Sequence, residues 1–366
     1  MTWALDPFAL ALNENPFPPL PSVRAALVQS IGAANRYPDL LPTRLRRLVA
    51  DHARVPEESV ILGAGASGVT MQVLQTMTRP GDRIVLSRPT FDGYPIFARM
   101  ARLTAVDVPL DAYGRHDLTA MARAASDARV VVLCRPHNPT GTLESVADVE
   151  RFLTDVPGDT IVLLDEAYME FVAPHQRLDV SELIGRFPNV VVLRTFSKAY
   201  GLAALRIGYG LAAPVPAASL WAMQMPFGIP TSAMVAVEAS YDAEAQLRQR
   251  IEQITAERRY LRARLGSAGV YTTDSQANFV YLPAASRPWR EIFAGTGLQV
   301  RHYPDGAVRI TIGTRASTRM VLATVERALS GPADAQRVRT PRAAAHTPGS
   351  RPVGSAAEHW PAPALG

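Results

Sequence analysis

The stretch VVVLRTFSKAYG, residues 190–201, places the one lysine of the chain directly after a run of β-branched and apolar residues. Of 38 lysine and arginine residues, only Lys198 is a lysine. An arginine stays protonated in proteins, whereas a lysine amine can lose its proton in a suitable site and attack a carbonyl carbon. Ligands of α/β enzymes bind at the carboxyl ends of the strands, where this lysine stands. The first hypothesis is therefore a lysine that forms a Schiff base, and the alternative is a surface lysine without a chemical role.

Six further runs resemble residues 190–193 and define the expected sheet. Several are almost entirely apolar, which is typical of strands buried on both faces, and helical stretches separate most of them. We therefore expect an α/β fold, a mostly parallel central sheet with helices on both faces. The candidate strands are residues 60–62, 83–86, 103–108, 130–133, 160–164, 190–193 and 207–211.

After about residue 230 the pattern changes to that of a small α+β domain. Residues 233–265 have helical spacing with one break near Ser240. Three short strands and a last helix follow, at residues 279–282, 299–302, 308–312 and 318–329.

The composition shifts along the chain predict its domain boundaries. The proline-rich start predicts an extended arm with one short helix, and the tail, rich in proline, alanine and arginine, predicts disorder, with Trp360 as a stray aromatic residue. We expect an N-terminal arm that belongs in part to the small domain, a large cofactor-binding domain, a small C-terminal domain and a disordered tail, at residues 1–45, 46–228, 229–330 and 331–366.

Charge and cysteine content exclude several classes of protein. The net charge is +5 and only the tail concentrates it, so nucleic-acid binding is not expected. Cys134 is the only cysteine, which excludes an internal disulfide and fits the cytoplasm. The N-terminus lacks the features of a signal peptide, and no apolar run approaches the roughly 20 residues that span a bilayer. No metal site is assigned.

Polar residues after two other candidate strands suit pyridoxal phosphate bound to Lys198. Asp165 follows the run 161–164 and can keep a pyridine nitrogen protonated, although an aspartate there can also cap a helix. Tyr168 can reach the hydroxyl of the cofactor ring. Asn138 can donate to the same oxygen, although Asn-Pro is also a plain turn former.

Two arginines and a glycine-rich turn supply candidate anion sites. The turn GAGASG, residues 63–68, opens a helix expected at 69–77, whose first N–H groups suit a phosphate. Arg206 and Ser197 can add contacts to that phosphate, and the alternative for Arg206 is a surface arginine. Arg309 alternates with apolar residues on a strand, so its side chain points either into the crevice, where it would hold a substrate carboxylate, or to solvent.

Taken together, the chain resembles a fold type I pyridoxal-phosphate aminotransferase. Within that family it is most similar to the histidinol-phosphate aminotransferases and their aromatic, phenylalanine-type branch. The matching segments occur in the family's order over roughly residues 10–330, namely 12–16, 36–39, 138–141, 165–168, 194–203, 276–280 and 308–314.

The resemblance implies a role for each matching residue. Lys198 carries the cofactor and moves the proton, and Asp165 pairs with the pyridine nitrogen. The other cofactor contacts are the phosphate group Ala64, Gly65, Ala66, Ser197 and Arg206, the ring-oxygen pair Asn138 and Tyr168, and Phe91 stacked on the ring. Tyr37 reaches the phosphate of a neighbouring subunit, so a homodimer with shared sites is implied. Arg309 binds the substrate carboxylate, and Asn13 and Asn278 belong to the substrate site.

The match has departures, and they leave the substrate open. In the phosphate turn the family often has an asparagine followed by an acidic pair, where this chain has Ala64, Ser67 and Gly68. The family's asparagine before Asn138 is His137 here, and Ala204 replaces a family glycine. The change in the phosphate turn, together with residues 20–26 and 275–279, favours the aromatic branch. The expected donor is an aromatic amino acid or histidinol phosphate, with 2-oxoglutarate as a typical acceptor. The alternatives are a decarboxylase or lyase on the same scaffold, an aminotransferase of a specialised pathway, and a cofactor-binding regulator, for which no DNA-binding segment is present.

Overall fold

The computed structural model describes residues 6–284 and 287–330, which contain two separate sheets. Both sheets belong to one compact unit that ends at Leu329. The expected disordered tail with Trp360 lies outside the described residues, and the boundaries near residues 45 and 228 stay a prediction. None of the helices in the described ranges is long and apolar enough to cross a membrane.

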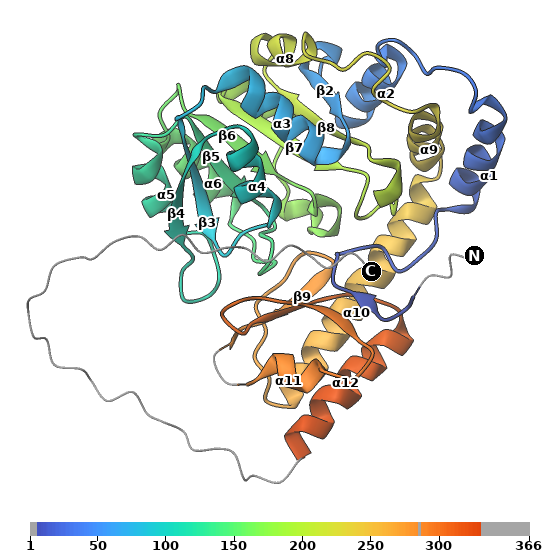
Figure 1. Cartoon of the computed structure of the whole chain (residues 1–366), viewed down its shortest axis with the longest axis vertical. Coiled ribbons are helices and arrows are strands. Elements are labelled where there is room, and N and C mark those ends of the chain that lie inside the picture. Colours follow the sequence, from blue (N-terminus) through green and yellow to red (C-terminus); the bar gives the residue numbers. More distant parts are fainter. Residues whose placement is uncertain (1–5, 285–286, 331–366) are drawn as a thin grey trace, which may run out of the picture. The chain divides into compact units, whose positions relative to one another are not determined.

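The large sheet has seven strands, and all seven candidate runs form it. The order is β2-β8-β7-β6-β5-β3-β4, and only β8 is antiparallel to its neighbours, which confirms the mostly parallel sheet (Figure 1). The strands are β2 (Val60–Gly63), β3 (Arg83–Arg88), β4 (Thr104–Pro109), β5 (Val130–Cys134), β6 (Ile161–Asp165), β7 (Val190–Thr195) and β8 (Gly208–Ala212).

The small sheet joins the N-terminal arm to the C-terminal part of the chain. The order is β1-β10-β11-β9, with β1 parallel to β10 and the other pairs antiparallel. The three expected C-terminal strands are present, and the arm adds a fourth. The strands are β1 (Ala9–Leu10), β9 (Phe279–Leu282), β10 (Gln299–His302) and β11 (Val308–Thr311).

Helices cover both faces of the large sheet. Side chains of α3, α4 and α8 pack on one face, and those of α2, α5, α6 and α7 on the other. The helices are α1 (Pro21–Ser30), α2 (Thr43–Ala53), α3 (Gly65–Met77), α4 (Gly93–Met100), α5 (Leu118–Ala125), α6 (Val146–Asp155), α7 (Val180–Arg186), α8 (Pro214–Trp221), α9 (Thr231–Asp242), α10 (Glu244–Ser267), α11 (Trp289–Phe293) and α12 (Arg315–Ser330). Short 3₁₀ turns are η1 (Ile31–Ala33), η2 (Glu57–Ser59), η3 (Met169–Phe171), η4 (Pro174–Gln176) and η5 (Ala203–Leu205).

Each face of the large sheet carries its own hydrophobic core, and the apolar strands contribute side chains to both. In β2, Ile61 packs on the α3 side, while Val60 and Leu62 pack on the opposite side, as the two-residue period of a strand requires. All three residues are fully buried. The apolar runs in the sequence therefore reflect burial on both faces.

Three helix boundaries differ from the expected ones. The long C-terminal helix breaks at Ala243, between α9 and α10, slightly later than expected near Ser240. The last helix starts at Arg315 instead of residue 318. The helix after the glycine-rich turn starts at Gly65, four residues earlier than expected, because the N–H of Gly68 already bonds to the carbonyl of Ala64.

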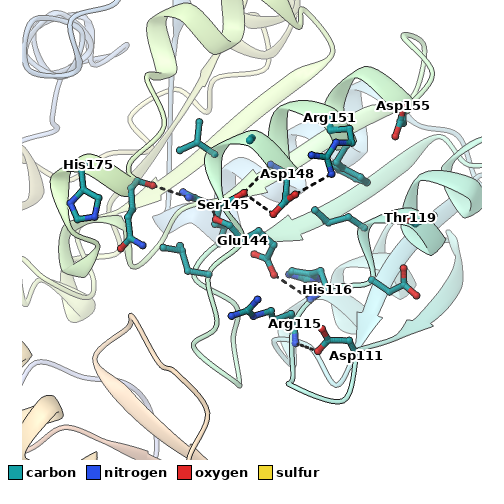
Figure 2. A pocket seen from close by; sticks show the side chains of 18 residues that line it. Asp111, Arg115, His116, Thr119, Glu144, Ser145, Asp148, Arg151, Asp155 and His175 are labelled. Carbon is teal, nitrogen blue, oxygen red and sulfur yellow. Dashed lines mark hydrogen bonds and ion pairs between the residues drawn. The ribbon is translucent and has the colours of Figure 1, made fainter.

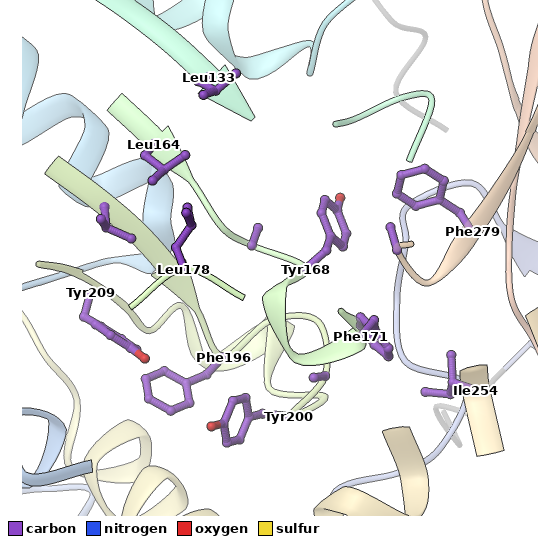
Figure 3. Packing of buried hydrophobic residues seen from close by; sticks show 14 of the residues in the cluster. Leu133, Leu164, Tyr168, Phe171, Leu178, Phe196, Tyr200, Tyr209, Ile254 and Phe279 are labelled. Atoms are coloured by element: carbon purple, nitrogen blue, oxygen red, sulfur yellow. The ribbon is translucent and has the colours of Figure 1, made fainter. Parts of the chain in front are cut away.

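An aromatic cluster lies beneath the turn that carries Lys198. The ring of Phe196 lies 4.8 Å from that of Tyr200 and 5.5 Å from that of Tyr209, measured between centroids (Figure 3). Phe196 and Tyr200 are both buried, so their packing anchors the turn to the core.

Candidate active site

Three candidate residues meet at the carboxyl edge of three neighbouring strands. Asp165 is the last residue of β6, Asn138 follows the end of β5, and Lys198 follows the end of β7. These strands are parallel and adjacent, with Cys134 of β5 and Leu193 of β7 both paired to Asp165. The expected convergence at one edge of the sheet is therefore present.

The N-terminal arm closes over Lys198. Its Nζ donates to the carbonyl of Leu12 at 3.1 Å, and the side chain is half-buried. Asn15 Nδ2 donates to the carbonyls of Lys198 and Ala199 at 3.2 and 2.9 Å. Gly201, with φ of 70°, lets the turn close against Asn15. The arm therefore fixes both the main chain and the amine of the lysine.

The surroundings of Lys198 favour its neutral amine. Burial lowers its pKa to about 8, assisted by the positive charges of Arg309 and Arg206 and opposed by Glu14 and Asp165. An amine with this pKa is roughly one tenth unprotonated at pH 7, so the neutral form that acts as a nucleophile and as a base is accessible there. An ordinary surface lysine would remain almost fully charged there.

Asp165 is a buried carboxylate with two hydrogen-bond donors. Tyr94 donates its hydroxyl to Oδ2 at 2.5 Å, and the main-chain N–H of Ala167 donates to Oδ1 at 3.0 Å. Burial raises the pKa of Asp165, and both hydrogen bonds oppose this rise. The carboxylate is thus held in one orientation at the ligand edge of the sheet.

Two amides converge on the hydroxyl of Tyr168. Asn13 Nδ2 lies 2.9 Å from this oxygen and Asn138 Nδ2 lies 3.3 Å from it, and both donate to it. Burial raises the pKa of Tyr168, so the phenol stays protonated. Because its oxygen accepts from two amides, its own proton is free to be donated to a further acceptor, such as a ring oxygen of a ligand.

Arg309 points toward these residues and not to solvent. From β11 it donates through Nη1 to Oδ1 of Asn138 and through Nη2 to the carbonyl of Ala11, the latter at 2.6 Å. The residue is 6% exposed, and its Nε has no hydrogen-bond partner among the described residues. A buried guanidinium with an unused donor suits a ligand carboxylate.

The start of α3 and Arg206 form an anion-binding corner. Arg206 lies within 3.4 Å of both Ser197 Oγ and the carbonyl of Ala64, through Nη1 and Nη2. Gly65 has φ of 72°, which side chains rarely adopt, and a Cβ atom there would lie 2.5 Å from Nη2 of Arg206, so this position favours glycine. The first N–H groups of α3, including that of Ala66, have no partner within the helix, and together with the guanidinium they suit a phosphate.

The remaining predicted residues differ in their placement. Phe91 packs edge-on against Tyr94, with ring centroids 5.6 Å apart, and so lies beside the partner of Asp165. Tyr37 shares no hydrogen bond or ring contact with the residues around Lys198 within the described ranges. It is 84% exposed, and its ring lies 5.0 Å from that of Phe227.

Asn13 and Asn278 brace the arm against the small sheet. Asn278 Nδ2 donates to the carbonyl of Asn13 at 3.0 Å, and the N–H of Asn13 donates to Oγ1 of Thr311 at 2.9 Å. Asn13 adopts a left-handed conformation with φ of 56°. Both asparagines are fully buried, and the Asn13 amide is directed at Tyr168.

Three supporting residues were not expected from the sequence. Tyr94 binds Asp165, and Glu166 forms a buried ion pair with Arg194, Oε2 to Nη2 at 2.8 Å. Glu166 directly follows Asp165, and Arg194 stands four residues before Lys198, so their position at strand ends was an available signal. Tyr94 lies three residues after Phe91, but nothing in the sequence indicates that Tyr94 binds Asp165.

The site fits pyridoxal phosphate by the chemistry of its donors. It combines an amine of lowered pKa, a fixed carboxylate, amide and phenol groups for a ring oxygen, and an anion corner. Among the described residues, no group of three histidine, cysteine or acidic side chains is placed to hold a metal ion.

Comparison with known proteins gives consistent matches over nearly the whole described chain. The family model for aminotransferase class I and II matches residues 6–325. An aromatic amino acid aminotransferase of Rhodococcus jostii is 42% identical over 317 residues, covering 86% of this chain and 88% of that protein. Another from Streptomyces avermitilis is 39% identical over 323 residues, covering 87% and 90%. The solved histidinol-phosphate aminotransferase of Sinorhizobium meliloti, in complex with pyridoxal-5′-phosphate, has a TM-score of 0.81 at 26% identity and covers 87% of this chain and 90% of that one.

Proposed function

Because the chain belongs to the class I and II aminotransferases, we propose that it transfers the amino group of an aromatic amino acid to a 2-oxo acid such as 2-oxoglutarate. The protein is an enzyme that depends on pyridoxal phosphate, as its family and its structural relatives do. When bound, the cofactor supplies an electron sink for the negative charge that develops at the substrate Cα.

The polar groups around Lys198 divide the binding of this cofactor among them. Asp165 holds the proton on the pyridine nitrogen, and Tyr168 and Asn138 bind the ring oxygen. The phosphate is held by the N–H groups and side chains at the anion corner, from Ala64, Gly65, Ala66, Ser197 and Arg206. Phe91 covers one face of the ring. The hydrogen bonds at Asp165, Tyr168 and Arg206 support these roles.

Lys198 carries the cofactor and then moves a proton. With the cofactor bound, Nζ would be the group that takes the proton from the substrate Cα and delivers it to the cofactor. A pKa of about 8 supports this role, since the neutral amine is accessible near neutral pH. Proton transfer by a positioned amine accelerates a reaction by about 10²–10⁴-fold.

The buried guanidinium of Arg309 is the observation that carries the proposal of a carboxylate substrate. It donates a hydrogen bond to Asn138 and has an Nε donor without a partner among the described residues. Its positive charge also helps to lower the pKa of Lys198. An arginine fork fixes a carboxylate in one plane. In that orientation the Cα–H bond, and not the bond from Cα to the carboxylate, faces the lysine. This orientation favours transamination over decarboxylation. We propose that Asn13 and Asn278 serve the substrate site by holding Tyr168 and the arm in place.

An exposed apolar side chain beside the lysine supports an aromatic substrate. Leu12 is 65% exposed while its carbonyl binds Lys198 Nζ, so its side chain is available to a ring. The relatives at about 40% identity are named aromatic amino acid aminotransferases. Histidinol phosphate is the second candidate, since the solved relative at 26% identity is named for it.

A comparison of donors tests the substrate proposal. Phenylalanine, tyrosine and histidinol phosphate are each assayed with 2-oxoglutarate, and kcat/KM is compared. The proposal expects the two aromatic amino acids to exceed histidinol phosphate by at least about tenfold, with 2-oxo acid as product. A higher kcat/KM for histidinol phosphate would contradict the proposed substrate. Release of carbon dioxide would contradict the proposed reaction.

We also propose a homodimer in which Tyr37 contributes to the phosphate site of the partner subunit. The exposure of Tyr37 and its separation from the residues around Lys198 support this arrangement. The single, buried Cys134 supports a cytoplasmic location.

A further inference from the structure

His137 is a fully buried residue that the transamination proposed above does not use. It directly precedes Asn138 in the loop that follows β5. Its ring nitrogens have one partner each. Nε2 lies 3.2 Å from Oγ of Ser87, and Nδ1 lies 2.9 Å from Oγ1 of Thr140. Because Ser87 belongs to β3, the neighbour of β5 in the sheet, the imidazole joins the loop around Asn138 to an adjacent strand.

The main chain closes this loop, residues 137–142, at its base. The N–H of His137 donates to the carbonyl of Thr142 at 2.9 Å, and the N–H of Gly141 donates to the carbonyl of His137 at 2.6 Å. Asn138 lies inside the closed loop, so the direction of its side chain depends on how the loop is held.

The hydrogen bonds around the loop determine which nitrogen of His137 carries a proton. The carbonyl of Gly114 can only accept, so the hydroxyls of Thr140 and Thr142 donate to it, at 2.7 and 2.8 Å. The proton of the Thr140 hydroxyl is then used, and Nδ1 of His137 must donate to this oxygen. Nε2 is left as the acceptor for the hydroxyl of Ser87. The network therefore specifies a neutral imidazole with its proton on Nδ1.

The surroundings of the ring favour this neutral form. Neither a hydrogen bond nor an ion pair joins it to a charged side chain in the described part of the chain. Burial, assisted by His116, holds the pKa of His137 well below its usual range. The rings of the two histidines lie 4.4 Å apart in an edge-on contact. His116 lines the cavity beside the starts of α5 and α6 (Figure 2), but His137 does not, so the contacts of its imidazole are those within the fold.

Asn138 needs a fixed direction because its amide serves both halves of the active site. Its Oδ1 accepts from Nη1 of Arg309, and its Nδ2 donates to the hydroxyl of Tyr168 at 3.3 Å. In the function proposed above, Arg309 binds the substrate carboxylate, and Asn138 and Tyr168 bind the ring oxygen of the cofactor. A tilt of the loop would displace both contacts of the amide.

The segment that leads into β9 contacts the other side of the loop. Thr273 Oγ1 donates to the carbonyl of Thr140 at 2.5 Å, and the N–H of Gln276 donates to the carbonyl of Gly141 at 2.7 Å. These bonds hold the part of the loop that follows Asn138, whereas His137 holds the part that precedes it.

We propose that His137 is a positioning residue for Asn138. Its neutral imidazole donates from Nδ1 to Thr140 and accepts from Ser87, and these two bonds hold the loop so that Nδ2 of Asn138 faces the ring oxygen of the cofactor. This role rests on the proposed function, in which Asn138 binds that oxygen. His137 itself transfers no proton.

The position of the proton can be measured by NMR in the unmodified holoenzyme with isotope-labelled histidine. The ring signals of His137 are those missing from a His137 variant. A neutral ring with its proton on Nδ1 is expected, unchanged from about pH 6 to pH 8. A proton on Nε2, or a charged ring in this range, would overturn the proposal.

Two substitutions separate the donor from the size of the side chain. The amide nitrogen of His137→Asn can take the place of Nδ1 and donate to Thr140, whereas that of His137→Gln lies farther along the side chain, near the place of Nε2. Because Asn138 donates to the ring oxygen, it stabilises negative charge there and lowers the pH midpoint of the visible absorbance change of the bound cofactor. His137→Gln is expected to raise this midpoint by about half a pH unit or more, and His137→Asn by less. A role in packing alone predicts the reverse order, since asparagine leaves the larger cavity.

A double substitution tests whether His137 acts through Asn138. In an Asn138→Ala background, His137→Gln should leave the midpoint where Asn138→Ala alone places it. His175→Asn, at an exposed histidine of η4, is the matched control and should not move the midpoint.

Three results of these absorbance measurements would each overturn the proposal. They are an unchanged midpoint in a folded His137→Gln variant, a larger shift in His137→Asn than in His137→Gln, and a further shift in the double variant. An unmodified chain that shows no cofactor absorbance would instead contradict the proposed function, and with it the role of Asn138 that His137 supports.

Discussion

The hydroxyl of Tyr94 donates a hydrogen bond of 2.5 Å to Oδ2 of Asp165, and both residues are buried. The bond joins α4 to the last residue of β6. Since burial raises the pKa of Asp165 and this bond opposes the rise, Tyr94 helps to keep the carboxylate ionised. Tyr94 is therefore a positioning residue for the carboxylate that is proposed to hold the proton of the cofactor ring.

Replacement of Tyr94 by phenylalanine should raise the pKa of Asp165, because one of its two donors is lost. An ionised Asp165 is needed, so the loss of activity at low pH should begin at a higher pH. A hydrogen bond to a charged group contributes about 1.5–3 kcal/mol, so kcat should fall roughly 10–100-fold with little change in KM. The pH profile of kcat checks this. Tyr113→Phe, at an exposed tyrosine, is the control, and an unshifted acidic limb for Tyr94→Phe would contradict the role.

Replacement of Arg309 by glutamine should raise KM for the amino acid and for the 2-oxo acid by about 10²-fold, because both lose the carboxylate partner. It should also raise the pKa of Lys198 above about 8, since a neighbouring positive charge is removed. The apoenzyme takes up pyridoxal phosphate through the neutral amine, so the midpoint of the rise in uptake rate with pH should lie at a higher pH in the variant than in the unmodified chain. Arg319→Gln, at an exposed arginine of α12, should change neither quantity. If KM rises without a shift in the pH midpoint, the electrostatic link to Lys198 is wrong.

Shared active sites can be tested by mixing two variants. Lys198→Ala lacks the lysine, and Tyr37→Ala lacks the side chain proposed to cross the interface. In a mixed dimer one site receives Lys198 from one subunit and Tyr37 from the other. After subunit exchange at limiting cofactor, about a quarter of the normal activity should return, since about half of the dimers are mixed and each has one complete site. If each mixture is no more active than its components, Tyr37 acts within its own subunit or not at all.

Glu170 should make stability fall between about pH 5 and pH 7. Burial raises its pKa to about 7 from its usual 4.5, opposed by a main-chain hydrogen bond, Arg194 and Arg177. In this window the folded state binds more protons than the unfolded state, so the free energy of unfolding decreases as pH rises. Glu170→Gln should therefore raise Tm by about 2–4 °C at pH 8 and have little effect at pH 5.

The control for this measurement is Glu182→Gln, at an exposed glutamate that pairs with Arg186. Its Tm should follow that of the unmodified chain at both pH values. A Glu170→Gln variant that is less stable at pH 8 than the unmodified chain would show that the carboxylate is charged and useful in the fold.

The sequence predicts the large sheet and the place of Lys198 because both depend on local pattern. Short continuous apolar runs rich in β-branched residues, such as residues 190–193, suit a strand covered on both faces. Residues that follow such strands share one edge, which brings Asn138, Asp165 and Lys198 together. These features need no knowledge of the tertiary structure.

The direction of Arg309 and the partner of Tyr94 depend on contacts between distant segments. Strand alternation shows that Arg309 lies on the opposite face of its strand from its apolar neighbours, but it does not show which segment packs against that face. Its partners, Asn138 and Ala11, are 171 and 298 residues away in the sequence. Likewise, a buried tyrosine requires a polar partner, but nothing in its own segment indicates that Asp165 is 71 residues later. Such pairs follow from packing, which the sequence pattern does not encode locally.

The most direct test of the central claim is reduction of the holoenzyme with borohydride, followed by tryptic digestion and mass spectrometry. Lys198 is the only side-chain amine in the chain, and cleavage occurs at Arg194 and Arg206 but not at a modified lysine. The account predicts one pyridoxyl-labelled peptide, residues 195–206, with the label on Lys198. An unlabelled 195–206 segment, or label only on the N-terminal amine, would contradict it.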